Sequence, residues 1–338
     1  MEDKIKKAIE LKENGQWWNQ ILYDKAYELI EKPYPVIVPS YNRPDCVVMS
    51  VFKENNIDDT TYHAYFVVRE SQKELYQESI GDSTNLHVMS FPDEEINSLG
   101  KTRKKIVDSF EDQIFMLDDD ITNLYYLLPD KVVNTYKFRS EEGSFFRILA
   151  MWQILHEIAI ELNPNIITSN IHLRDFWWSN TPAIGYPETA VKINQSVSFF
   201  QFWAFNCRLA HELGINFKHT AGHEDRDFEI RAVLEGCDFA SLNNITYRSK
   251  PLSVGFTGGQ HDNLIDRMNY QADVMMKEFG QYKFVSDPVT SKGYRDIKID
   301  FKKANKTIVT YDWLTELNNK YDDAFADIPT NKIKKSLW

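Results

Sequence analysis

The stretch QIFMLDDD, residues 113–120, places three consecutive carboxylates directly behind a short apolar run. Adjacent like charges repel one another, so two interpretations compete: an acidic turn in solvent, or the end of a buried strand that needs negative charge to hold a cation. A solvated turn would more often carry Gly, Asn or Pro among the acids. Alternate carboxylates, here Asp118 and Asp120, suit a divalent cation that shares its ligands with a phosphate-bearing substrate.

Apolar strands alternate with helices on the N-terminal side of this stretch. The expected strands cover residues 34–38, 62–68, 86–89 and 113–117, and the expected helices cover 44–55, 71–79 and 98–110. Continuously apolar strands separated by helices indicate a parallel sheet covered on both faces. In such a sheet the ligand binds beyond the carboxyl ends of the strands, where residues 40–43 and 118–120 lie. The N-terminal third therefore predicts an α/β half of the nucleotide-binding kind.

The rest of the chain supplies further elements. We expect helices over residues 2–31 and 144–162 and another from residue 264. We expect strands over 166–171, 197–205 and 306–311, with a final helix after the last strand. We predict a helical N-terminal extension (1–32), a catalytic domain (33–263) and a C-terminal helical extension packed on it (264–338). The catalytic domain divides into a nucleotide-sugar half (33–125) and an acceptor half (126–263).

Composition limits the function classes. The chain has 338 residues, 43% of them hydrophobic, and 39 basic against 50 acidic side chains give a formal charge of −11. General adhesion to nucleic acid or anionic lipid is therefore not expected, and a polyanion partner needs a local basic patch. The three cysteines match no zinc spacing, and no signal peptide or apolar run of membrane-spanning length is present. We expect a soluble cytoplasmic protein with no membrane partner and make no prediction of its oligomeric state.

An ordered set of motifs resembles a known family. The motifs are VPSYNRP at 38–44, GKTR at 100–103, FMLDDD at 115–120 and GHED at 222–225. The four motifs in this order resemble those of the GT-A glycosyltransferases, and the resemblance covers about residues 34–262. LGKTR and HEDRDF also resemble the glycosyltransferases associated with TET-like oxygenases, a phage-rich group. The resemblance implies a GT-A-like, Rossmann-type, mostly parallel sheet flanked by helices. It also implies an enzyme that moves a hexosyl or pentosyl group from a nucleotide-sugar, here expected to be a UDP-sugar.

The resemblance assigns the nucleotide-sugar and metal residues by their match to the family's motifs. The first-strand loop would hold the nucleoside, through Pro39, Ser40, Tyr41 and Arg43. Arg69 or Glu70, after the second strand, would touch the base, and Arg103 would face the nucleotide. Asp118, Asp119 and Asp120 match the acidic motif, with Asp120 as a ligand of Mn²⁺ or Mg²⁺, Asp118 at the metal or the ribose, and Asp119 at the sugar or in solvent. His261, in the glycine-rich loop 255–262, would complete the metal shell.

The catalytic base is expected at the start of a helix near residue 224. By its match to inverting members of the family, Asp225 would take the proton of the acceptor hydroxyl, with Glu224 beside it. Both acids also suit a helix N-terminus without any catalytic role. His223, Trp177 and Trp178 are the acceptor-binding candidates, because aromatic rings can stack on a sugar or a base, although the tryptophans would equally suit a hydrophobic plug.

The sequence indicates the acceptor of the sugar less clearly than the donor. The narrower resemblance implies a hydroxymethylated pyrimidine in double-stranded DNA, met in the host cytoplasm if the protein is phage-encoded, and Lys101, Arg103, Lys104, Lys105 and residues 298–306 could supply basic patches. A glycan, protein or small-molecule acceptor stays open. So do a non-catalytic nucleotide-sugar-binding module and a nucleotidyltransferase, although the latter usually carries a glycine-rich loop after its first strand and residues 40–44 contain no glycine.

Overall fold

The computed structural model describes residues 18–132, 135–171, 190–194, 202–218, 223–242, 245–249, 264–291 and 293–312. Its helices are α2 (Trp18–Leu29), α3 (Val47–Glu54), α4 (Lys73–Ile80), α5 (Leu99–Ser109), α6 (Phe145–Leu162), α8 (Cys207–Glu212), α9 (Glu224–Leu234) and α10 (Leu264–Phe279), with short 3₁₀ turns η1 (Ile57–Asp59) and η2 (Glu70–Gln72). The expected alternation of strands and helices from 34 to 117 is confirmed.

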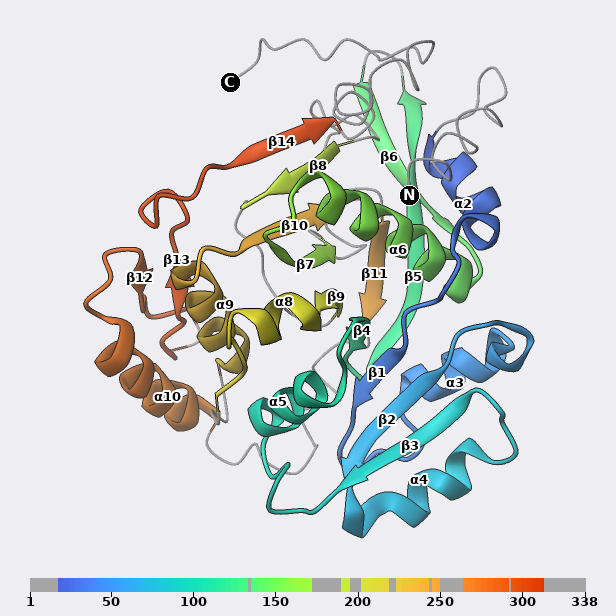
Figure 1. Cartoon of the computed structure of the whole chain (residues 1–338), viewed down its shortest axis with the longest axis horizontal. Helices are drawn as coiled ribbons and strands as arrows, with labels where there is room; N and C mark the ends of the chain where they lie inside the picture. The colour runs from blue at the N-terminus through green and yellow to red at the C-terminus, as the bar shows by residue number, and fades with distance from the viewer. Residues whose placement is uncertain are drawn as a thin grey trace.

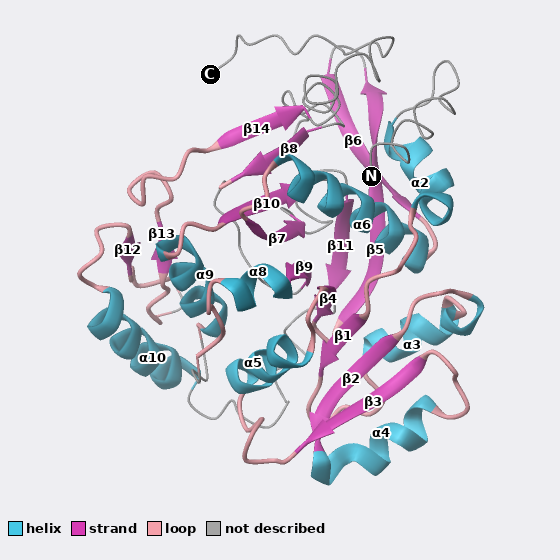
Figure 2. Cartoon of the chain, viewed as in Figure 1, coloured by secondary structure: helices cyan, strands magenta, loops and turns pink. Residues whose placement is uncertain are grey.

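A nine-stranded sheet forms the centre of the fold, in the order β14-β8-β10-β7-β9-β4-β1-β2-β3 (Figure 2). Its strands are β1 (Val36–Pro39), β2 (Ala64–Arg69), β3 (Leu86–Phe91), β4 (Gln113–Leu117), β7 (Ile166–Ile171), β8 (Ala190–Ile193), β9 (Phe202–Asn206), β10 (Asp238–Leu242) and β14 (Val309–Asp312). Only β8 and β9 run against the other seven. The predicted mostly parallel α/β sheet is therefore confirmed.

Helices cover both faces of this sheet (Figure 1). Residues of α2, α3 and α6 belong to one buried apolar cluster, and residues of α5, α8, α9 and α10 belong to a second one. Each strand contributes alternate side chains to the two clusters, as Val36 and Ile37 of β1 do. This explains why the strands read as continuous apolar runs in the sequence.

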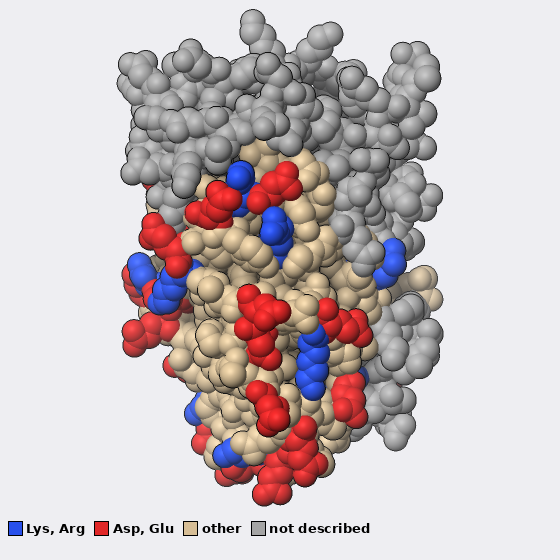
Figure 3. All heavy atoms as spheres, turned by 90° about the vertical axis from the view of Figure 1, so that its right-hand side faces the viewer, with Lys and Arg blue, Asp and Glu red and all other residues tan. Residues whose placement is uncertain are grey.

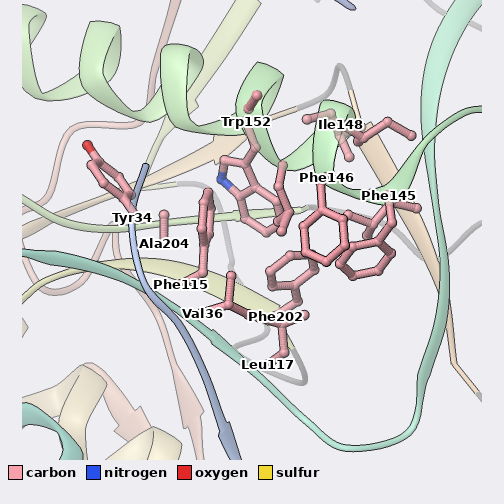
Figure 4. Close-up of a cluster of buried hydrophobic side chains, with 14 of the residues drawn as sticks. Tyr34, Val36, Phe115, Leu117, Phe145, Phe146, Ile148, Trp152, Phe202 and Ala204 are labelled. Atoms are coloured by element: carbon pink, nitrogen blue, oxygen red, sulfur yellow. The ribbon is translucent and has the colours of Figure 1, made fainter. Parts of the chain in front are cut away.

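Helix α6 lies over the middle of the sheet and makes the densest part of the first cluster. Figure 4 shows Phe146 and Trp152 of α6 above Phe115 and Phe202 of the strands. The rings of Trp152 and Phe202 are 4.2 Å apart, and all four side chains are buried. Burial of large aromatic rings is worth several kcal/mol each, so this layer anchors β4, the strand that leads into the acidic segment.

A second sheet begins where the acidic segment ends. Strand β5 (Ile121–Val132) pairs antiparallel with β6 (Thr135–Glu142) and with β11 (Ile245–Ser249). The hydrophobic pattern of the sequence does not indicate these strands, nor β8 and β10. Asp118, Asp119 and Asp120 therefore lie at the junction of two sheets, between the buried strand β4 and β5.

The C-terminal part of the described chain packs against the same domain. Ala272, Met275 and Phe279 of α10 belong to the second apolar cluster, β12 (Val285–Ser286) pairs with β13 (Lys298–Ile299), and β14 extends the central sheet beside β8. Among the described helices none has the length and apolar character needed to span a membrane.

Candidate active site

The loop after β1 and the acidic segment after β4 are held together by direct hydrogen bonds. Ser40 Oγ donates to Asp119 Oδ2 at 2.6 Å, and Arg43 Nη1 lies 2.9 Å from Asp119 Oδ1. The two loops meet because β1 and β4 are parallel neighbours, so their carboxyl ends lie at one edge of the sheet. Asp119 therefore fixes the two predicted nucleotide-binding segments to each other.

Helix α4 supports the same loop from behind. Tyr76, which is fully buried, places its hydroxyl 2.7 Å from Ser40 Oγ and accepts a hydrogen bond from Arg43 N at 3.0 Å. Gln72 Oε1 accepts from Asn42 N at 3.1 Å, and Gln72 Nε2 returns a bond to Asn42 Oδ1. Neither Tyr76 nor Gln72 belongs to a motif, so the sequence contains no signal for their role.

The predicted base-contacting residues also come together. The Arg69 guanidinium, at the end of β2, lies 4.1 Å from the ring centroid of Tyr41 in the β1 loop. Pro39 is buried as the last residue of β1. Pro39, Ser40, Tyr41, Arg43 and Arg69 thus share one edge of the sheet, and two of these five side chains are cationic.

Arg103 connects the acidic segment to the predicted base helix. This side chain of α5 is 3% exposed, and its Nη1 and Nη2 atoms lie 2.7 Å from Glu224 Oε1 and 3.1 Å from Asp118 Oδ1. Its guanidinium carbon also lies 5.0 Å from the centroid of the Trp203 ring. The contact of Arg103 with the nucleotide stays a prediction, and within the protein its contacts are with carboxylates and an indole ring. Trp203, on β9, is a second residue of this region that sequence reasoning did not single out.

The acidic segment contains hard oxygen donors. Burial raises the pKa of Asp118 to about 8, and the neighbouring Asp120 and Asp119 act in the same direction while Arg103 opposes the shift. Both carboxylate oxygens of Asp119 bind Ser40 and Arg43, whereas Asp118 meets Arg103 through Oδ1. Asp118 and Asp120 stay the predicted metal ligands. Within the described residues no group of three or more metal-ligating side chains is present. Two carboxylates nevertheless fit Mg²⁺ or Mn²⁺, because substrate phosphates usually complete the shell.

Helix α9 presents the predicted base. Glu224, Asp225 and Asp227 occupy its first turn, where negative charge is favoured by the helix dipole. They face different partners: Glu224 pairs with Arg103, Asp227 accepts bonds from Lys218 N and Arg231, and Asp225 Oδ1 accepts from Arg226 N at 2.8 Å. Asp225 is half-buried, so of the three acids it is the one with a carboxylate accessible at the helix terminus.

His223 lies directly beside this carboxylate as the N-cap of α9. It has a left-handed backbone (φ 56°) and is buried, and its Nε2 has no hydrogen-bond partner within the described part of the chain. Burial lowers the pKa of His223, while Asp225 acts in the opposite direction. The remaining candidates, His261, Trp177 and Trp178, lie outside the described residues.

Two of the surface lysines of α5 are paired with acidic side chains, and Lys101 donates to the Glu94 carbonyl. Lys104 lies 2.5 Å from Asp108, Lys105 lies 2.6 Å from Glu95, and Arg103 is not part of this surface because it is buried. On the face that Figure 3 shows, acidic side chains are spread over the lower half with few basic ones among them. Lys104 and Lys105 are therefore offset by neighbouring carboxylates, which weakens their attraction for a polyanion.

Comparisons with known proteins point to one family. The family model described as TET-Associated Glycosyltransferase matches residues 34–256, and no curated protein gives a significant match. Similar solved structures include S. aureus TarS 1–349 in complex with UDP-GlcNAc (16% identity, TM-score 0.43, 72% of this chain and 66% of that one). Another is Mycobacterium tuberculosis glucosyl-3-phosphoglycerate synthase in complex with Mn²⁺, UDP-glucose and phosphoglyceric acid. The two chains are 11% identical with a TM-score of 0.39, and the match covers 88% of this chain and 94% of that one. The chain thus spans just under two thirds of the S. aureus chain.

Proposed function

This chain belongs to the TET-associated glycosyltransferase family, and on that premise we propose that it transfers a sugar from a UDP-sugar to the hydroxyl of a hydroxymethylated pyrimidine in DNA. The observation that carries the proposal is the Arg103 bridge. One buried guanidinium binds Asp118 of the acidic segment and Glu224, the neighbour of Asp225. The groups proposed to handle the leaving diphosphate and the acceptor hydroxyl therefore belong to one connected site.

In the proposed reaction Asp225 removes the proton of the acceptor hydroxyl as its oxygen attacks the anomeric carbon. The new glycosidic C–O bond forms while the bond from the anomeric carbon to the diphosphate breaks, and UDP leaves with the bonding electrons. A divalent cation held by Asp118 and Asp120 would supply positive charge at the departing diphosphate. Attack from the side opposite the diphosphate inverts the anomeric configuration.

The nucleotide is proposed to lie against the β1 loop. Tyr41 and Arg69 offer a flat cationic surface for the base, and Arg43 offers a guanidinium near the acidic segment. The hydrogen bonds of Ser40 with the Tyr76 hydroxyl and with the accepting carboxylate of Asp119 hold this loop before any ligand binds, which lowers the entropy cost of binding.

The test is a coupled assay for UDP release and product. The protein is incubated with Mn²⁺, a panel of UDP-sugars, and duplex DNA of one sequence that contains either 5-hydroxymethylcytosine or cytosine. We expect rapid UDP release and a mass increase of one sugar only in the hydroxymethylated duplex. NMR of the product nucleoside should show an inverted anomeric carbon, and the Asp225→Asn variant should turn over about 10²- to 10⁴-fold more slowly with normal UDP binding.

The controls separate the parts of the proposal. Equal UDP release with both duplexes and no product on DNA would reject the DNA acceptor but keep the transferase, and a glycan or small-molecule acceptor would then be sought. A retained anomeric configuration, or a near-normal rate for Asp225→Asn, would reject the base assignment. Pyrophosphate release from a nucleoside triphosphate would instead support nucleotidyl transfer.

A further inference from the structure

One face of the central sheet carries buried polar side chains that the proposed reaction does not use. Asn170 on β7 lies directly opposite Ser241 on β10, and on its other side it lies opposite Trp203 on β9. Opposite residues of neighbouring strands point to the same face, so Trp203, Asn170 and Ser241 form a continuous row, here called the Asn170 row. Asn170 is 1% exposed and Ser241 is 0% exposed.

The side-chain polar atoms of Asn170 and Ser241 are unpaired among the described residues. Asn170 Oδ1, Asn170 Nδ2 and Ser241 Oγ have no hydrogen-bond partner in the described part of the protein. An unpaired buried polar group costs about 1–3 kcal/mol, and nearly all such groups in native proteins are paired. The preceding residue of the same strand follows the rule, since Ser169, on the opposite face, accepts a bond from Trp152 Nε1 at 3.1 Å. On β7 the unpaired polar side chains therefore lie on the face of the Asn170 row.

The row lies next to the candidate active site. Trp203 is opposite Met116, which precedes Asp118 by two residues, and the Arg103 guanidinium that binds Asp118 and Glu224 lies over the Trp203 ring. With strands spaced about 4.8 Å apart, Asn170 is two strands, or roughly 10 Å, across the sheet from β4. Strands β7 and β10 each end one residue after the row, at Ile171 and Leu242, so the row is at their carboxyl ends.

We infer that Asn170 and Ser241 form a sugar subsite that hydrogen bonds the ring hydroxyls of the sugar being transferred. An amide and a hydroxyl each donate and accept without net charge, which suits the hydroxyl groups of a sugar and not a phosphate. The charged groups suited to phosphate lie instead around the β1 loop and the acidic segment. This inference rests on the proposed function, because it takes the diphosphate of the donor to lie at the acidic segment two strands away.

Calorimetry with UDP and with two UDP-sugars, UDP-glucose and UDP-N-acetylglucosamine, tests the subsite. In Asn170→Leu and Ser241→Ala the affinity for the sugar nucleotide that the wild type binds best should fall about three- to tenfold, the usual worth of one neutral hydrogen bond, while UDP affinity is unchanged. The melting temperature of both variants should stay the same or rise, since each substitution removes an unpaired buried polar group. A purely structural residue would show the opposite, a lower melting temperature with an unchanged preference for sugar nucleotide over UDP.

Thr168→Val is the matched control. Thr168 lies on the same face two residues before Asn170, is fully buried, and has an equally unpaired Oγ1, but its neighbours across the strands are Phe205 and Phe239, away from the carboxyl edge. This variant should bind UDP and the UDP-sugars as the wild type does.

Three results would overturn the inference. The first is unchanged UDP-sugar affinity in both variants, and the second is an equal loss of UDP and UDP-sugar affinity. The third is normal donor binding and donor hydrolysis with lost transfer to DNA, which would assign the row to the acceptor. A wild-type protein that binds neither UDP nor either UDP-sugar would reject the proposed donor, and the subsite with it, and that failure is visible without any variant.

Discussion

Three neighbouring aspartates have three different surroundings, and this difference answers why the chain tolerates the repulsion between them. Arg103 pairs with Asp118, and Ser40 and Arg43 bind Asp119, so groups from other elements offset part of the repulsion within the segment. Asp120 follows at the start of the second sheet. The acidic segment is therefore neither a solvated turn nor three equivalent metal ligands.

At Arg103 we predict a large effect on stability. Arg103→Met leaves the carboxylates of Asp118 and Glu224 without their cation, and removal of one partner of a buried ion pair typically costs about 3–5 kcal/mol. Urea unfolding should show that loss, and adding Glu224→Gln should restore part of it. The control is Lys104→Met, which breaks an exposed pair on the same helix and should cost about 0.5 kcal/mol or less. Equal effects of the two variants would contradict the bridging role.

At Asp120 we predict a loss of activity with little loss of fold. Asp120→Ala removes a carboxylate proposed to hold the cation at the leaving diphosphate, so UDP release should fall by at least about two orders of magnitude while the melting temperature stays near that of the wild type. Excess EDTA should have the same effect on the wild-type enzyme, and added Mn²⁺ should reverse it. Full activity in EDTA would end the metal assignment.

At the scale of elements, helix α4 and the loops at the carboxyl edge act as one unit. Tyr76 of α4 holds Ser40 and Arg43, Asp119 holds the same two residues from the β4 side, and Arg103 of α5 holds the start of α9. Five parts of the chain thus share one hydrogen-bonded edge. Glu224, at the start of α9, is held there by Arg103 of α5.

Tyr76→Phe tests this support of the β1 loop. The substitution keeps the ring but removes the hydroxyl that bonds Ser40 Oγ and Arg43 N, so UDP affinity should fall about threefold or more and unfolding free energy should drop by about 1–3 kcal/mol. Tyr62→Phe is a close control, because the Tyr62 hydroxyl is equally buried but has no hydrogen-bond partner among the described residues. That variant should be as stable as the wild type or more so. Similar losses in both would show that ring packing alone matters.

At the scale of the whole molecule, the two apolar clusters enclose a few ionisable groups, and these make stability depend on pH. His156 on α6 is the clearest case, since it is fully buried beneath the sheet, with its ring 5.9 Å from that of Tyr34. Burial lowers the pKa of His156 to about 3. The folded protein therefore keeps this imidazole neutral at a pH where the unfolded chain would protonate it.

The sign of the effect follows from proton linkage. Below an unfolded pKa of about 6.5 the unfolded state binds the proton and the folded state does not, so this contribution to stability is lost as the pH falls from about 6.5 toward 3. Between pH 7 and pH 5 the loss from His156 should be about 2 kcal/mol. Chemical unfolding of His156→Phe should show a pH dependence reduced by about that amount. Parallel stability curves for variant and wild type would contradict the assignment.

The sequence alone determined the parts of this protein that depend on local pattern. Continuous apolar runs separated by amphipathic helices predicted strands β1 to β4 and the helices between them, since a strand buried on both faces must be apolar throughout. The order of the motifs indicated the glycosyltransferase family, and the rule that ligands bind at the carboxyl ends of parallel strands predicts where the candidate site lies. Strand β10 escaped prediction because it pairs with β7 and β8, which are distant in the chain. The hairpin β5–β6 pairs locally, and the hydrophobic pattern did not indicate it.

Only the tertiary structure decided which side chains meet. Arg103 turned out to bind Asp118 and Glu224, which is 121 residues away, and Asp119 turned out to bind the β1 loop, because packing and charge compensation in the interior choose partners without regard to sequence distance. Tyr76, Trp203 and the Asn170 row carry no sequence signal at all. These residues stand out because of their position opposite residues on neighbouring strands and because of the hydrogen bonds that they make or lack in the interior. Strand register and burial both arise only when the sheet has formed.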